Sequence, residues 1–81
     1  MSMFYVYILQ SQKDKSYYYG VTNNLKKRFE EHNQGDSRYT SNKTPFKIVW
    51  YCVFNDREKA YDFEKYLKSS SGHAFSRKRF V

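Results

Sequence analysis

Two runs of aromatic and β-branched residues near the start of the chain constrain its fold more than any other feature. Residues 4–9 and residues 17–21 both have the composition of β-strands. Residues 10–16 between them are polar and turn-like, so the two runs are predicted to pair as a hairpin. A helix is predicted to follow at once, because the side-chain oxygen of Thr22 or Asn23 can accept an otherwise unpaired backbone N–H at a helix start.

The rest of the chain extends this start into a mixed architecture. The first helix is predicted to run to about Asn33 and to stop near Gly35, since glycine suits the left-handed position after a helix end. Residues 37–47 are polar and contain a proline, which indicates a loop. Residues 48–54 have the character of a third strand.

Two further helices complete the predicted fold. Asn55 or Asp56 is expected to cap the second helix, which reaches about Lys68 before a run of serines and a glycine ends it. A short basic helix is predicted over residues 74–80. The resulting order is strand–strand–helix–strand–helix–helix, an α+β fold with a small, mainly antiparallel three-stranded sheet flanked by helices.

The chain is small for the core that it must build. Its 81 residues are expected to form a single domain, residues 1–81, near the lower size limit for a stable hydrophobic core. Cys52 is the only cysteine, so an internal disulfide and a cysteine-based zinc site are excluded. No apolar run approaches the ~18 residues of a membrane span, and no signal peptide is recognisable. We therefore expect a cytoplasmic protein with no membrane partner.

The charge of the chain indicates a polyanionic partner. The net charge is +7, and no acidic residue follows Glu64. Interleaved aromatic residues would add stacking surfaces for bases, so nucleic acid is the expected partner, DNA rather than RNA. A merely solvated basic face is the alternative. The residues expected to contact nucleic acid are Lys26, Lys27, Lys65, Lys68, Arg77, Lys78 and Arg79.

The predicted first helix carries two polar side chains on its inner face. Arg28 and His32 share a helical stripe with Leu25 and Phe29. Polar groups on an inner edge need anionic or hydrogen-bonding partners. Their stems could instead pack while the polar heads reach solvent, as arginine often does. The occurrence of both residues on one face favours a functional role.

The second helix places a carboxylate in an apolar stripe. Glu64 shares this stripe with Ala60, Phe63 and Leu67, and a buried carboxylate without a partner costs several kcal/mol. One role for Glu64 is a salt bridge to Arg28. Another is to hold a divalent cation, because Mg²⁺ is commonly bound by one or two carboxylates with waters and phosphate oxygens. The two roles are compatible.

The tyrosines divide between the two faces of the predicted hairpin. Tyr5 and Tyr7 share one face of the first strand, and Tyr18 and Gly20 share one face of the second. A glycine inside a strand indicates a bulge or a close approach of a ligand to the backbone. An ordinary phenol has a pKa of ~10, so a tyrosine acting as a base would need a nearby cation.

Cys52 lies in a predicted buried strand and is expected to be an inert core thiol.

Taken together, these residues resemble the GIY-YIG nuclease domain family, in its small standalone bacterial form similar to the N-terminal domain of excinuclease C. Tyr5-Val6-Tyr7 stands where the family has GIY, and Tyr18-Tyr19-Gly20 stands where it has YIG. The run G-x-T-x-x-L-x-x-R-x-x-x-H from Gly20 to His32 and the helix with Glu64 complete the resemblance, which spans nearly the whole chain.

The resemblance implies hydrolysis of phosphodiester bonds with one divalent metal ion, Mg²⁺ or Mn²⁺. It implies that Tyr7 acts as general base or orients the attacking water, with Tyr18 assisting. Arg28 would stabilise charge on the phosphoryl group. His32 would contact a phosphate, tune the tyrosine or take part in proton transfer, and Glu64 would bind the metal.

The chain departs from the family pattern at three places. Tyr5 replaces the first glycine of GIY, and Tyr19 replaces the isoleucine of YIG. Many members carry an asparagine near the end of the domain, whereas this chain has none after Asn55. That role is vacant or taken by a residue such as His73.

The expected function is a metal-dependent endonuclease acting on DNA, in repair or in the processing of branched structures. A monomer with one site per chain would nick a duplex. One alternative is a nucleic-acid-binding module with the same fold and little or no cleavage. Another is a structural domain in which Arg28 and Glu64 form an internal ion pair.

Overall fold

A three-stranded antiparallel sheet, with strand order β2–β1–β3, organises the part of the chain that the computed structural model describes, residues 3–34 and 43–69. Its strands are β1 (Phe4–Ser11), β2 (Tyr17–Thr22) and β3 (Phe46–Phe54). The hairpin predicted at the start of the chain is thus formed by β1 and β2, and β1 is the central strand.

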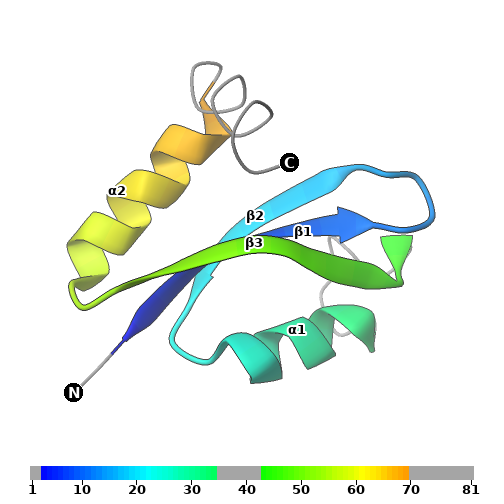
Figure 1. Cartoon of the computed structure of the whole chain (residues 1–81), viewed down its shortest axis with the longest axis horizontal. Helices are drawn as coiled ribbons and strands as arrows, with labels where there is room; N and C mark the ends of the chain where they lie inside the picture. The colour runs from blue at the N-terminus through cyan, green and yellow to red at the C-terminus, as the bar shows by residue number, and fades with distance from the viewer. Residues whose placement is uncertain (1–2, 35–42, 70–81) are drawn as a thin grey trace.

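Two helices cover the opposite faces of this sheet (Figure 1). They are α1 (Leu25–Asn33), between β2 and β3, and α2 (Arg57–Lys68), after β3. The predicted α+β class and the order of elements are therefore confirmed as far as α2. The helix predicted over residues 74–80 lies outside the described residues.

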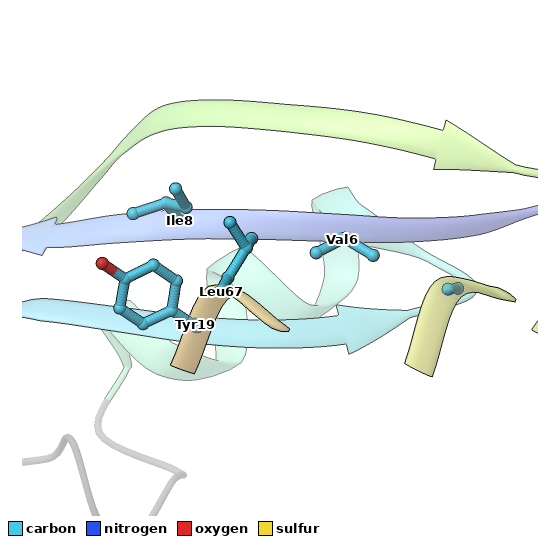
Figure 2. Close-up of a cluster of buried hydrophobic side chains, with 5 residues drawn as sticks. Val6, Ile8, Tyr19 and Leu67 are labelled. Atoms are coloured by element: carbon cyan, nitrogen blue, oxygen red, sulfur yellow. The ribbon is translucent and has the colours of Figure 1, made fainter. Parts of the chain in front are cut away.

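The side chains of β1 alternate between the two faces of the sheet and contribute to a buried cluster on each face. Val6 and Ile8 point toward α2, where they pack with Tyr19 of β2 and with Ala60 and Leu67 of the helix. Figure 2 shows Leu67 projecting from α2 onto β1 and β2, beside Ile8 and Tyr19. A fully buried leucine of this kind contributes about 1.5–3 kcal/mol.

The other face of the sheet carries a second cluster under α1. Tyr7, Leu9 and Phe46 form its buried centre, and Leu25 and Phe29 of α1 pack against it. This cluster contains Tyr7, so that part of the predicted site lies on the α1 face of the sheet.

Both described helices begin at a side-chain cap. Asn24 caps α1, accepting the Lys27 N–H at 3.1 Å, whereas Thr22 or Asn23 was the predicted cap. The reason is that Thr22 belongs to β2 and its hydroxyl accepts the Asn24 N–H at 3.1 Å, which moves the helix start along the chain. Asp56 caps α2 as predicted, accepting the Glu58 N–H at 2.9 Å.

Neither of these two helices of the described chain is long and apolar enough to cross a bilayer.

β3 begins two residues earlier than the predicted start at residue 48, at Phe46. The cause is the side-chain amide of Asn33, at the end of α1. Its oxygen accepts the Phe46 N–H at 2.6 Å, and its nitrogen donates to the Phe46 carbonyl at 3.3 Å. These bonds satisfy the backbone of Phe46 on the side away from β1 and tie the end of α1 to the start of β3.

Candidate active site

The phenol of Tyr7 crosses the neighbouring strand at a glycine. Tyr7 of β1 is paired with Gly20 of β2, within a register that runs without a shift. A Cβ on Gly20 would lie 2.5 Å from Tyr7 Cζ, which is too close for any other residue to be accommodated without movement. The glycine was predicted to mark a bulge or the approach of a ligand. Instead, it makes room for a side chain of the protein itself.

His32 is the interior partner of Tyr7. The Oη of Tyr7 and the Nε2 of His32 are 3.3 Å apart, and the tautomer of the imidazole decides which atom donates. Tyr18 closes the group, with its ring centroid 4.7 Å from that of His32. Tyr7 is 1% exposed and His32 is fully buried, so this part of the predicted site belongs to the core.

Burial keeps both groups uncharged near neutral pH. It raises the pKa of Tyr7 to about 12, and the neighbouring Tyr18 adds to the shift while a hydrogen bond with Arg28 opposes it. Burial also lowers the pKa of His32 to about 4, helped by the positive charge of Arg28. The buried His32 ring contacts the Tyr7 hydroxyl, and tuning of the tyrosine, one of the roles implied for His32, fits this position.

Arg28 connects this interior group to the surface. Its side chain is 35% exposed and donates from Nη1 to the Glu31 carboxylate at 3.1 Å, one turn along α1. Burial works against its charge, but hydrogen bonding with Glu31 and Tyr7 leaves the pKa of Arg28 above its usual value. The guanidinium is therefore a permanent cation beside the Tyr7 phenol.

Glu64 approaches from the helix on the other face of the sheet. Its side chain is 14% exposed and pairs with Lys68 Nζ at 2.8 Å. The predicted ion pair with Arg28 is not the one formed: Arg28 pairs with Glu31 and Glu64 with Lys68, because each partner lies one turn away on the same helix. The charge of Glu64 nevertheless contributes to the raised pKa of Tyr7, so its field reaches the phenol.

A pocket at the β2 edge of the sheet links Arg28 to α2. Arg28 lines it together with Arg57 and Tyr61, both from the first half of α2. Arg57, Tyr61 and Glu64 follow the spacing i, i+4, i+7 and so lie along one side of α2. Arg57 and Tyr61 were not among the predicted site residues, although their helical spacing from Glu64 was a signal that could have found them.

The donor set suits a hard divalent cation held by one carboxylate. Within residues 3–34 and 43–69, no group of three or more His, Cys, Asp or Glu side chains is arranged around a common metal position. Glu64 offers a mostly buried carboxylate, and Mg²⁺ is often held by one or two such groups with waters and substrate phosphate oxygens. Cys52 is half-buried, and burial raises the pKa of its thiol, as expected for an inert cysteine.

The predicted nucleic-acid contacts differ in their surroundings. Lys26 and Lys27 on α1 and Lys65 on α2 are exposed. Lys68 is exposed as well, but its ammonium group is paired with Glu64. Arg77, Lys78 and Arg79 lie outside the described residues.

Comparison with known proteins identifies the family. The sequence profile of the GIY-YIG catalytic domain matches residues 3–78. The chain belongs to the GIY-YIG family. This is a family of nucleases, and the match confirms the resemblance carried by the two tyrosine motifs.

Relatives of this GIY-YIG domain are themselves small proteins. A UPF0213 protein from Clostridium perfringens is 45% identical over 67 residues, which cover 82% of this chain and 71% of the relative. A UPF0213 protein from Haloquadratum walsbyi is 38% identical over 66 residues, or 80% of this chain and 73% of the relative. The solution NMR structure of a UPF0213 protein from Bacillus halodurans is similar with a TM-score of 0.58 at 32% identity, over 93% of this chain and 80% of that one.

Within this GIY-YIG domain, the two motif tyrosines are brought together by strand pairing. The GIY-like segment lies in β1 and the YIG-like segment in β2, with Tyr7 opposite Gly20. The ring centroids of Tyr7 and Tyr18 are 6.4 Å apart. Tyr7, Tyr18 and Gly20 of the two triplets thus lie together on the α1 face of the sheet, whereas Val6 and Tyr19 pack on the α2 face.

Proposed function

We propose that the chain is a metal-dependent endonuclease that hydrolyses phosphodiester bonds in DNA. The observation that carries this proposal is the meeting of the buried Tyr7–His32 pair with the permanent cation of Arg28, beside a pocket that α2 also lines. The net charge of +7 supports a polyanionic substrate. Repair or processing of branched DNA is the proposed setting.

Each side chain has a distinct part in the proposed reaction. Arg28 binds the scissile phosphate and stabilises the charge that develops on it. Tyr7 is protonated at neutral pH because its pKa is about 12, so we assign its hydroxyl the orientation of the attacking water, with Tyr18 assisting. His32 fixes the phenol through the 3.3 Å contact and acts as a positioning residue.

Glu64 is the proposed ligand of the divalent cation, Mg²⁺ or Mn²⁺. When bound, such a cation polarises the phosphate and stabilises the leaving oxygen. The ion pair with Lys68 occupies one oxygen of this carboxylate, and the Lys68 side chain is 54% exposed, so its ammonium group can move away when a cation binds.

The test is cleavage of supercoiled plasmid, branched DNA and structured RNA, each with Mg²⁺, Mn²⁺ or EDTA. Glu64→Gln, which keeps the side-chain size, is compared with Glu58→Gln, which removes an exposed carboxylate from the same helix. We expect metal-dependent nicking of DNA that falls by at least about 100-fold in Glu64→Gln and persists in Glu58→Gln. Cleavage that is equal in both variants, with a folded protein by circular dichroism, would contradict the proposal.

A second candidate function is nucleic-acid binding without cleavage. One observation favours it: the Glu64 carboxylate is already paired with Lys68 at 2.8 Å. Binding of DNA that is unaffected by metal, with no cutting of any substrate offered, would select this candidate over the first.

A further inference from the structure

The pocket beside Arg28 is larger than one phosphate contact requires. Its volume is about 620 Å³, within the range of pockets that hold small ligands. Its polar lining comes from the end of β2 and from both helices: Thr22, Asn23, Arg28, Arg57 and Tyr61. Since the roles proposed above use only Arg28 of this set, the α2 side of the pocket has no function assigned to it.

The charge of the pocket selects an anion. Arg28 and Arg57 are the charged residues of its lining, and both are positive. A pocket with two arginines and no lining carboxylate attracts phosphate groups, which arginine binds through paired N–H donors. Two guanidinium groups also suit two phosphates better than one, because each can engage a separate phosphate.

Arg57 is held in place by an aromatic ring. Its guanidinium carbon lies 5.4 Å from the centroid of the Tyr61 ring, a cation–π contact one turn along α2. Arg57 forms none of the ion pairs found within residues 3–34 and 43–69, which join Arg28, Lys43 and Lys68 to carboxylates. The Arg57 guanidinium is therefore in contact with Tyr61 and has no carboxylate of the described residues within ion-pair distance.

We propose that Arg57, positioned by Tyr61, binds a second phosphate of the substrate strand, adjacent to the phosphate held by Arg28. The inference rests on the proposed function, because it takes Arg28 as the contact of the scissile phosphate. The strand then follows the side of α2 that carries Arg57, Tyr61 and Glu64. The ligand is a nucleic-acid strand at least two phosphates long.

Binding of a fluorescently labelled DNA duplex, measured by anisotropy in EDTA over a series of salt concentrations, tests the contact. Arg57→Gln is compared with Lys59→Gln, which removes one positive charge from an exposed position of α2 that does not line the pocket. We expect Arg57→Gln to weaken binding by about tenfold and to reduce the salt slope by about one. Lys59→Gln should leave the slope close to that of the wild type. Equal slopes in both variants would overturn the inference.

The position of the phosphate is tested with neutral methylphosphonates placed one at a time around the mapped cleavage point. The wild type should lose affinity when the phosphate next to the cleaved one is neutral, and Arg57→Gln should be insensitive at that position. Tyr61→Phe should bind like the wild type, whereas Tyr61→Leu should resemble a partial loss of Arg57. Equal sensitivity of wild type and Arg57→Gln at every phosphate would overturn the inference.

The two proposals fail in different ways. If the wild type cuts DNA while Arg57→Gln binds and cuts like the wild type, this inference falls and the proposed function stands. If the wild type cuts neither DNA nor RNA, the proposed function falls, whereas the salt slope of Arg57→Gln still decides whether Arg57 binds a phosphate.

Discussion

The phenol ring of Tyr7 lies against the backbone of Gly20 on the adjacent strand, in the space that a Cβ would otherwise fill. The glycine of the YIG-like motif is thus explained by packing and not by a flexible turn. Its neighbour across the strands is the tyrosine of the GIY-like motif. The two motifs therefore contact each other directly, through the Tyr7 ring and the Gly20 backbone.

Substitution of Gly20 by alanine should displace the Tyr7 ring. The new methyl group would overlap the phenol, and such overpacking typically costs about 1–3 kcal/mol of unfolding free energy. Urea denaturation measures the loss, and cleavage should fall in parallel because the Tyr7 hydroxyl moves. The wild type measured under the same conditions is the reference; a Gly20→Ala variant as stable as the wild type would contradict the packing argument.

Acid should destabilise the fold through His32. Its pKa is about 4 when folded and ~6.5 when unfolded, so below pH 6.5 the unfolded chain binds the proton more readily. The stability conferred by the neutral ring is complete above pH 6.5 and is lost as the pH falls toward 4, by at most about 3 kcal/mol.

Urea denaturation between pH 4 and 8 measures this loss, and His32→Gln should flatten that part of the curve. NMR titration in a His73→Gln background, which leaves one imidazole, should give the low pKa directly. A His32 resonance that titrates near 6.5 would show that the ring is accessible to water.

Replacement of Arg28 should remove activity and little stability. Arg28→Lys keeps the charge but loses the planar pair of donors, so cleavage should fall by about 100-fold or more. The Arg28–Glu31 pair is about one-third exposed on both sides, and such pairs contribute at most about 0.5 kcal/mol. Glu31→Gln is the matched control, because it breaks the pair and leaves Arg28 in place; equal loss of cleavage in both variants would assign the effect to the pair.

Removal of the Lys68 charge should strengthen metal binding. Lys68 lies 2.8 Å from the Glu64 carboxylate, where it both occupies the oxygen and repels a second cation. Lys68→Gln should lower the dissociation constant for Mn²⁺, measured by electron paramagnetic resonance, by about threefold. Lys65→Gln, also exposed on α2, should have no such effect. Unchanged binding in Lys68→Gln would indicate that Glu64 is not the ligand.

Much of the fold was predictable because period-two and helical patterns are local. The aromatic alternation of β1 gave the strand and its two faces, and the polar run after it gave the hairpin. The start of α1 was placed incorrectly because three consecutive polar residues could each cap a helix. Asn24 is selected by two hydrogen bonds: its side chain accepts the Lys27 N–H, and its own N–H donates to the Thr22 hydroxyl.

The residues of the candidate site were predicted better than the contacts between them. Helical spacing placed Arg28 and His32 on one face, and they do meet Tyr7 there. It could not show that α1 and α2 cover opposite faces of the sheet, which is why the Arg28–Glu64 ion pair was wrong. Helical spacing from Glu64 could have marked Arg57, but only the placement of the two helices shows that Arg57 lines a pocket together with Arg28.

Tyr7 belongs both to the buried cluster under α1 and to the candidate site. This affects how the protein loses activity on heating. In many enzymes the active-site region loosens before the rest, and activity declines ahead of unfolding. Here the Tyr7 phenol lies on the central strand, where local opening requires the strands of the sheet to separate. Heat inactivation and global melting should therefore coincide in a single transition.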